Sequence, residues 1–94
     1  MAAALAAVPA AAQGNKALGE YLSSECVTCH QLSGRQQAGI PAIVGLPEAR
    51  LTEALNEYKA KKRSNPVMQT IAGKFSNEEI AALAAYFGSL KSRR

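Results

Sequence analysis

Both cysteines and the only histidine of this 94-residue chain lie in one short run, C-V-T-C-H, from Cys26 to His30. The two intervening residues place the thiols of Cys26 and Cys29 about one helical turn apart, so both can reach the same edge of a flat ligand. A thiol can add across a vinyl group of a porphyrin, and an imidazole directly after the second thiol then falls under the iron. The run therefore predicts covalent attachment of one haem c, with His30 as an axial ligand.

Three other chemistries use two cysteines at this spacing. A thioredoxin-like redox pair needs a strand–helix–strand context, and no strand-like alternation surrounds the motif. A zinc site needs a second pair of ligands, which this sequence does not supply. A simple disulfide leaves His30 without a role. These three interpretations remain as weaker alternatives, because haem attachment accounts for all three residues.

Met68 is the only methionine outside the first twelve residues. A lone methionine is usually a flexible filler of the hydrophobic core. Because His30 is the only histidine, a second imidazole ligand is impossible, and a thioether is the best remaining sixth ligand for the iron. We therefore expect Met68 to bind the iron opposite His30, which leaves no open position for oxygen or peroxide.

Residues 31–47 contain three glycines and two prolines, a composition that predicts an irregular loop. The carbonyl of Pro41 in this loop is a candidate acceptor for the Nδ1–H of His30. Such a bond orients an imidazole ligand and tunes its basicity. The alternative is that Pro41 is simply a turn residue, as prolines in loops usually are.

Three periodic segments are expected to position these groups. Apolar residues at helical spacing predict a helix from Lys16 to about Glu25 and another from Pro47 to about Lys62. The run Ser64-Asn65-Pro66 should break the second of these helices. Ser76 and Glu79 form a capping box, followed by an apolar stripe, and so predict a C-terminal helix.

Gly19 lies inside the first predicted helix, where a glycine costs about 1 kcal/mol relative to alanine. Close approach of a crossing helix would justify that cost. We expect the C-terminal helix to cross there, with Tyr86 or Phe87 at the contact. The alternative is that a short, weak helix merely tolerates the glycine.

Composition limits the range of functions. Hydrophobic residues make up 48% of the chain, but aromatic residues only 5%, and there is no tryptophan. A chain of this length forms one small domain whose apolar core is marginal, so a haem would be part of that core. The formal net charge of +4 favours an acidic protein partner. No nucleic-acid recognition motif accompanies the basic residues, so nucleic-acid binding is not expected.

The run K-A-K-K-R ends the second predicted helix. Positive charges there are favourable to the helix dipole, and this alone is a sufficient explanation. The functional alternative is the rim of a docking surface for a redox partner, formed by Lys59, Lys61, Lys62, Arg63 and Lys74. In either case Lys91, Arg93 and Arg94 are expected to be a solvated tail.

Residues 1–12 are uncharged and mostly small. They are similar to the apolar end of a secretory leader with cleavage after Ala12, and the alternative is a disordered arm. We therefore expect a single domain over residues 13–94, located in the periplasm. No segment reaches the roughly 20 apolar residues of a membrane span, so no transmembrane segment is expected.

The order of these features resembles a class I c-type cytochrome over nearly all of residues 15–91. The features are a short N-terminal helix, C-x-x-C-H, a G-I-P loop, a middle helix, N-P-V-M and an aromatic-bearing C-terminal helix. The resemblance implies a small all-α fold with three to five helices around one covalently bound haem. It also implies thioether bonds at Cys26 and Cys29, a proximal ligand at His30, a carbonyl bond from Pro41 and a distal ligand at Met68.

Within that class, the run from N-P-V-M to A-A-Y-F is similar to one haem domain of the two-haem cytochromes. These include the cytochrome subunit of flavocytochrome c sulfide dehydrogenase. Only one attachment motif is present, so we expect a one-haem protein.

Taken together, these expectations describe an electron carrier without substrate chemistry of its own. Its partners would be a donor dehydrogenase and an acceptor oxidase or another cytochrome, met as a monomer or as a weakly held subunit. Two alternatives remain. One is a haem subunit of a dehydrogenase complex, for example in sulfur-compound oxidation. The other is a haem enzyme or gas sensor in which a small molecule displaces Met68.

Overall fold

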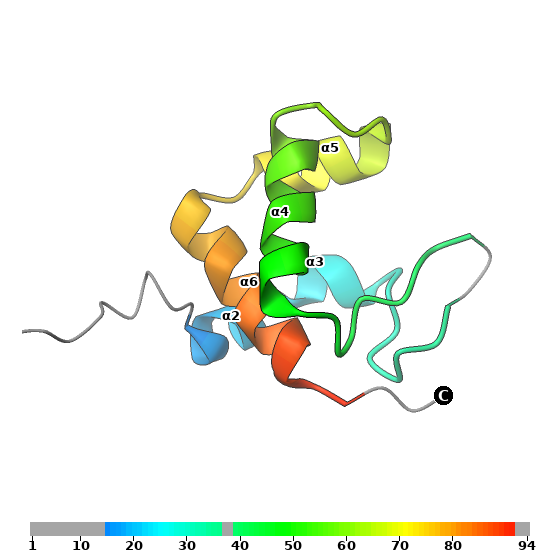
Figure 1. Ribbon diagram of the computed structural model, residues 1–94, viewed down its shortest axis with the longest axis vertical. Coiled ribbons are helices and arrows are strands. Elements are labelled where there is room, and N and C mark those ends of the chain that lie inside the picture. The colour runs from blue at the N-terminus through cyan, green and yellow to red at the C-terminus, as the bar shows by residue number, and fades with distance from the viewer. Residues whose placement is uncertain (1–14, 37–38, 92–94) are drawn as a thin grey trace, which may run out of the picture.

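The structure of the protein is a computed structural model, which describes residues 15–36 and 39–91. Within these residues it contains only helices, joined by turns and loops (Figure 1). They are α2 (Lys16–Leu22), α3 (Ser24–Val27), α4 (Glu48–Lys59), α5 (Pro66–Gly73) and α6 (Asn77–Ser89). The predicted all-α fold is thereby confirmed. Residues 1–12, Arg93 and Arg94 lie outside the described residues.

The C-terminal helix α6 is the centre of the packing. Both α2 and α4 pack against it, and α4 also packs against α5. At the crossing of α2 and α6, a Cβ atom added to Gly19 would lie 2.1 Å from the carbonyl oxygen of Ala82 and 2.7 Å from the Cβ atom of Tyr86. The crossing expected at Gly19 is therefore present, with Tyr86 at the contact. Only glycine allows the two backbones to approach this closely.

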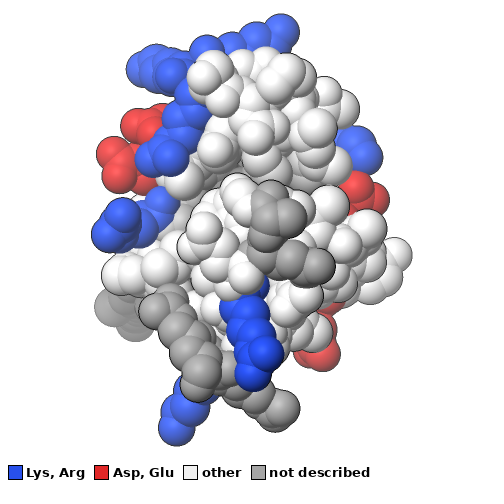
Figure 2. Space-filling view, turned by 90° about the vertical axis from the view of Figure 1, so that its right-hand side faces the viewer, with Lys and Arg blue, Asp and Glu red and all other residues white. Residues whose placement is uncertain are grey.

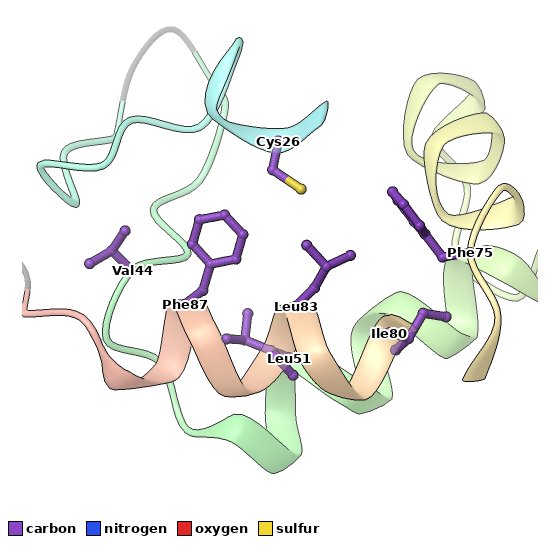
Figure 3. Close-up of a cluster of buried hydrophobic side chains, with 8 residues drawn as sticks. Cys26, Val44, Leu51, Phe75, Ile80, Leu83 and Phe87 are labelled. Atoms are coloured by element: carbon purple, nitrogen blue, oxygen red, sulfur yellow. The ribbon is translucent and has the colours of Figure 1, made fainter. Parts of the chain in front are cut away.

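The hydrophobic core lies along the inner face of α6 (Figure 3). Ile80 and Leu83 of α6 are almost completely buried, and Phe87 lies one helical turn further on. The sulfur of Cys26 points from α3 into this group of side chains. The whole cluster consists of Cys26, Val44, Leu51, Phe75, Ile80, Leu83, Ala84 and Phe87. The attachment motif is thus anchored in the core by its first cysteine.

Local sequence signals explain where most helices begin. Asn15 caps α2 by accepting a hydrogen bond from the amide of Leu18 at 3.2 Å. Ser76 and Glu79 form the expected capping box at the start of α6, because each side chain accepts a bond from the other's backbone amide. Such caps satisfy amides that have no partner within the helix.

The first predicted helix is interrupted. α2 ends at Leu22 and α3 begins at Ser24, whereas a continuous helix to about Glu25 was expected. The hydroxyl of Ser23 donates to the carbonyl of Glu20 at 2.7 Å. A serine that bonds to the backbone in this way competes with regular helix geometry.

The end expected for the middle helix was wrong. α4 ends at Lys59 rather than near Lys62, because Lys61 adopts a positive φ of 64°. The amide of Lys61 bonds to the carbonyl of Tyr58 at 3.0 Å, and the amide of Lys62 to that of Glu57 at 2.8 Å. These two bonds define a Schellman motif, in which the left-handed position usually holds glycine. A lysine there gives no sequence signal for the helix end.

The helix α5 was not expected, since Ser64-Asn65-Pro66 was interpreted only as a break. Asn65 caps this helix through the amide of Met68 at 3.0 Å, and Pro66 occupies its first turn. Proline at the first helical position is a start signal, since its missing amide would have no partner there. Met68 therefore lies on a helix rather than on a loop.

Among the described helices, none combines the length and the apolar character that a membrane-spanning helix requires.

Candidate haem-binding site

The attachment motif forms one continuous helical turn. Cys26 belongs to α3, and its carbonyl accepts bonds from the amide of Cys29 at 3.1 Å and from the amide of His30 at 2.8 Å. Both thiols are free; Cys26 is buried and Cys29 is exposed. The sulfur of Cys26 thus lies inside the hydrophobic core, and Cys29 lies at the surface of the protein.

Burial changes the chemistry of the inner sulfur. Desolvation, helped by the negative charge of Glu25, raises the pKa of the Cys26 thiol to about 11. Removing a thiolate from water is unfavourable, so the free thiol stays neutral at pH 7. A thioether sulfur carries no proton and no charge, and it suits this apolar position.

His30 is held in one orientation. The residue is buried, with 9% of its surface exposed, and its Nδ1 lies 2.7 Å from the carbonyl oxygen of Pro41. A carbonyl only accepts hydrogen bonds, so Nδ1 carries the proton and Nε2 keeps its lone pair. This is the tautomer that binds a metal through Nε2. The hydrogen bond expected from the sequence is thus present.

Met68 belongs to another element, the helix α5. It is half-buried in the first turn of α5. The C-terminal end of α5 is joined to α3 by an ion pair between Lys74 Nζ and Glu25 Oε1, at 3.0 Å. The helix that carries Met68 is therefore linked directly to the helix that carries Cys26.

The side chains present fit a haem c better than they fit a zinc site or a disulfide. Within the described residues, no group of three or more His, Cys, Asp or Glu side chains could hold a metal ion, which argues against zinc. The two cysteines are not joined in a disulfide. The remaining set is two free thiols on one turn, an imidazole in the metal-binding tautomer and a thioether on a neighbouring helix.

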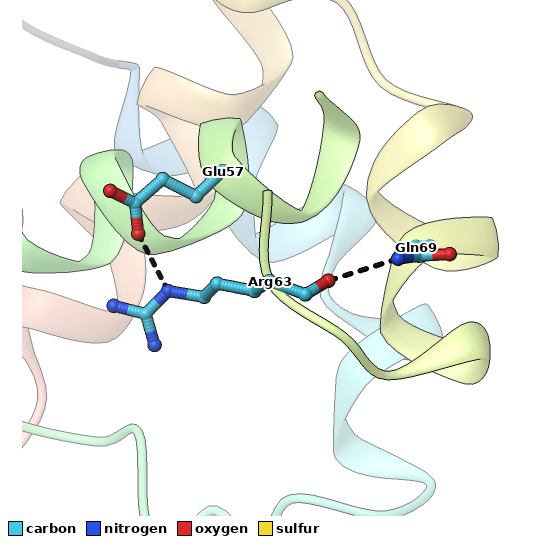
Figure 4. Close-up of polar contacts among 3 residues, drawn as sticks. All are labelled: Glu57, Arg63 and Gln69. Atoms are coloured by element: carbon cyan, nitrogen blue, oxygen red, sulfur yellow. Dashed lines mark hydrogen bonds and ion pairs between the residues drawn. The ribbon is translucent and has the colours of Figure 1, made fainter. Parts of the chain in front are cut away.

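The basic residues expected at a docking rim differ in their surroundings. Lys59 donates to the carbonyl of Phe75 and is half-buried. Arg63 pairs with Glu57 at 2.7 Å, and its carbonyl accepts a bond from Gln69 at 2.9 Å (Figure 4). Lys74 is engaged with Glu25, as described above.

Lys61 and Lys62 differ from these three. Their side chains are exposed and make no ion pair within the part of the chain that the structure describes. Of the five basic residues predicted to form the rim, only Lys61 and Lys62 therefore have exposed side chains without such a contact among the described residues. The roles of Lys59 and Lys74 were missed, because each joins residues far apart in the sequence and leaves no local pattern.

Comparisons with known proteins agree with this chemistry. The family described as Cytochrome c matches residues 11–91. The cytochrome subunit of sulfide dehydrogenase from Chlorobaculum tepidum is 35% identical over 88 residues, which cover 94% of this chain and 80% of that protein. Cytochrome c-553 from Helicobacter pylori is 36% identical over 72 residues, which cover 74% of this chain and 75% of that protein.

A solved structure supports the fold. The crystal structure of reduced recombinant cytochrome c4 from Pseudomonas stutzeri superposes with a TM-score of 0.75 at 26% sequence identity. The match covers 97% of this chain and 54% of the cytochrome c4 chain, so this chain spans about half of that protein. With the single C-x-x-C-H motif and the metal-binding tautomer of His30, these matches show that the chain belongs to the cytochrome c family of electron-transfer proteins, with one covalently attached haem c.

Proposed function

We propose that residues 13–94 form a single exported domain that carries one electron at a time between protein partners in the periplasm. Cys26 and Cys29 hold the haem through thioether bonds, and His30 and Met68 bind its iron. The bound haem supplies the redox chemistry, in which the iron alternates between Fe(III) and Fe(II). The chain has no substrate chemistry of its own in this proposal, because His30 and Met68 would both bind the iron and leave it no position for a substrate.

The orientation of His30 is the observation that carries the proposal. The bond of 2.7 Å to Pro41 fixes the proton on Nδ1 and leaves the lone pair of Nε2 available to bind the haem iron. The same turn places the two thiols beside the imidazole. Met68 completes the site as a neutral ligand, which raises the reduction potential of the iron.

Covalent attachment provides the first test. The exported protein should keep its haem through denaturation and acid–acetone extraction, and its mass should exceed that of the mature polypeptide by one haem. Cys26→Ala with Cys29→Ala should release any remaining haem under the same treatment. Haem that is fully extractable from the parent protein would overturn the proposed site.

A second candidate is a subunit of a larger dehydrogenase. It is favoured by the 35% identity to the cytochrome subunit of sulfide dehydrogenase, which extends over 94% of this chain. Stable co-purification with a second polypeptide, together with rapid reduction of the haem by that polypeptide's substrate, would support the subunit role. Reduction by several separately purified dehydrogenases, without a stable complex, would support the freely diffusing carrier.

Binding of carbon monoxide separates both candidates from a gas sensor or haem enzyme. A carrier whose Met68 stays on the iron should bind little carbon monoxide in the reduced state at neutral pH. Ready binding would show that the thioether is displaceable, and it would favour the haem enzyme or sensor instead.

A further inference from the structure

The helix that carries Met68 is attached to the rest of the molecule mainly on one side. The substantial contacts between described helices join α2 to α6, α4 to α6 and α4 to α5. Helix α5 therefore depends on α4 for its packing, and Ala72 is its only buried residue. In Figure 1 it lies at the edge of the bundle. Helices with few buried contacts open more readily than the core elements around them.

One polar contact fixes the C-terminal end of α5. Lys59 is the last residue of α4, and its ammonium group donates to the carbonyl of Phe75 in a half-buried position. Phe75 follows Lys74, the cap residue of α5, and its side chain is buried in the core. A charged donor makes a stronger bond than a neutral one, and partial burial limits competition from water. The turn after α5 is thus joined to α4 by both packing and charge.

Two further contacts hold α5, but both are exposed. Lys74 pairs with Glu25 at 3.0 Å, and their side chains are 51% and 43% exposed. Gln69 donates to the carbonyl of Arg63 at 2.9 Å, also at the surface. Exposed contacts of this kind contribute little, because water and salt compete with them. The bond from Lys59 is therefore the principal polar restraint on α5.

We propose that Lys59 is a positioning residue that holds α5, and with it Met68, in place for ligation to the haem iron. The inference rests on the proposed ligation by Met68. The thioether competes with external ligands for the iron, and the outcome depends on how often α5 moves away. By restraining the end of α5, Lys59 lowers the affinity of the iron for ligands from solution and keeps the reduction potential high.

The test compares two variants of the holoprotein that lose the same charge. Lys59→Met removes the half-buried donor, and Lys62→Met removes an exposed lysine only three residues away. Imidazole is titrated into each oxidised protein, and its displacement of Met68 is followed by absorption. We expect Lys59→Met to bind imidazole about tenfold more tightly than the parent, the effect of losing one charge-assisted hydrogen bond. Its reduction potential should also fall, whereas Lys62→Met should match the parent in both measurements.

Amide hydrogen exchange separates positioning from general loosening of the fold. In Lys59→Met, the amides of residues 69–73 in α5 should exchange faster, while those of residues 80–87 in α6 keep their protection. Lys59→Arg keeps a charged donor and should restore imidazole affinity toward that of the parent. If Lys59→Met does not accumulate as folded protein, Lys59→Gln takes its place with the same expected directions.

Equal imidazole affinity in the Lys59 and Lys62 variants would overturn the inference. Faster exchange throughout α6 would also overturn it, because Lys59 would then support the whole fold rather than α5. Failure of the proposed function is distinguishable from either result. It would already appear in the parent, as extractable haem or as a spectrum without a methionine ligand.

Discussion

At the scale of single residues, the proposed ligand Met68 would affect the electronic character of the site more than any other side chain outside the attachment motif. It is the only methionine among the described residues, and it lies on α5, whose C-terminal end is linked to α3 by the ion pair between Lys74 and Glu25. Its sulfur is a soft ligand, and such ligands favour Fe(II) over Fe(III).

Met68→Ala should therefore remove the weak red absorption band of methionine bound to Fe(III) and lower the reduction potential. Changes of axial ligand move haem potentials within a span of about 0.8 V, so the shift should be large compared with the error of a redox titration. Val67→Ala is the matched control, because the Val67 side chain is 65% exposed on the same helical turn. If Met68→Ala kept both the band and the potential, another group would have to be the sixth ligand.

Residues with local signatures could be found from the sequence, and residues with distant partners could not. Cys26, Cys29 and His30 form a five-residue motif whose spacing expresses its chemistry directly. The bond from His30 to Pro41 could also be predicted, because a histidine ligand needs a hydrogen-bond acceptor for its second nitrogen. The bond from Lys59 to the carbonyl of Phe75 joins the end of α4 to the turn after α5, and the residue types alone give no sign of it.

At the scale of elements, the crossing of α2 and α6 sets the frame for the attachment motif. α2 is followed directly by α3, which contains Cys26. The packing of α2 against α6 therefore fixes where the cysteines lie. Gly19 permits the close approach, since a Cβ atom there would overlap the carbonyl of Ala82.

Gly19→Ala should consequently destabilise the fold, by roughly 1–3 kcal/mol or more from overpacking at a rigid backbone contact. Gly73→Ala provides the contrast. It lies at the end of α5 with nothing within 4 Å of an added Cβ, and there alanine should be neutral or slightly stabilising. Chemical denaturation of the two holoproteins measures both effects. Equal stabilities would mean that α2 can move off α6 without cost.

Helices with a strong apolar stripe or a capping box could be predicted, and short helices between them could not. α6 has both signals, and its start at Asn77 follows the expected cap, Ser76. α5 has eight residues and a proline in its first turn, so the same Asn-Pro pair that starts it also reads as a break. Whether the Asn-Pro pair only ends one helix or also starts the next depends on packing of the following residues. Here α5 packs against α4, and this contact is not visible in the local sequence.

At the scale of the whole molecule, positive charge is concentrated where α4 turns into α5. Lys61 and Lys62 are exposed there without ion-pair partners among the described residues. In Figure 2, Lys and Arg side chains lie along the top and upper left edge of this face, with acidic side chains beside them on the left and uncharged surface to their right. Close to this turn is an apolar hollow lined by Pro66, Val67, Thr70 and Ile71. An apolar area beside unpaired cations is suited to brief contact with an acidic protein.

Lys61→Glu combined with Lys62→Glu should slow reduction by the physiological donor at low salt without changing the spectrum. The effect should fade as added salt shortens the screening length, which is about 10 Å at 0.1 M. Lys16→Glu with Lys91→Glu makes the same change in net charge away from this turn, and it should slow the reaction less. Stopped-flow reduction across a salt series gives the comparison. Identical rates for the two double variants would contradict a docking role, and the charges of Lys61 and Lys62 would then be explained by their position at the end of a helix.

The burial of Cys26 also has a consequence for the order of events in biosynthesis. Its sulfur is part of the core that α6 completes, and only 8% of the residue remains exposed. Because side chains of α6, the last of the described helices along the chain, pack around this sulfur, we expect a porphyrin vinyl group to reach it most readily before α6 has docked. We therefore expect attachment to precede closure of the fold, and haem supplied to the assembled helices should attach more slowly.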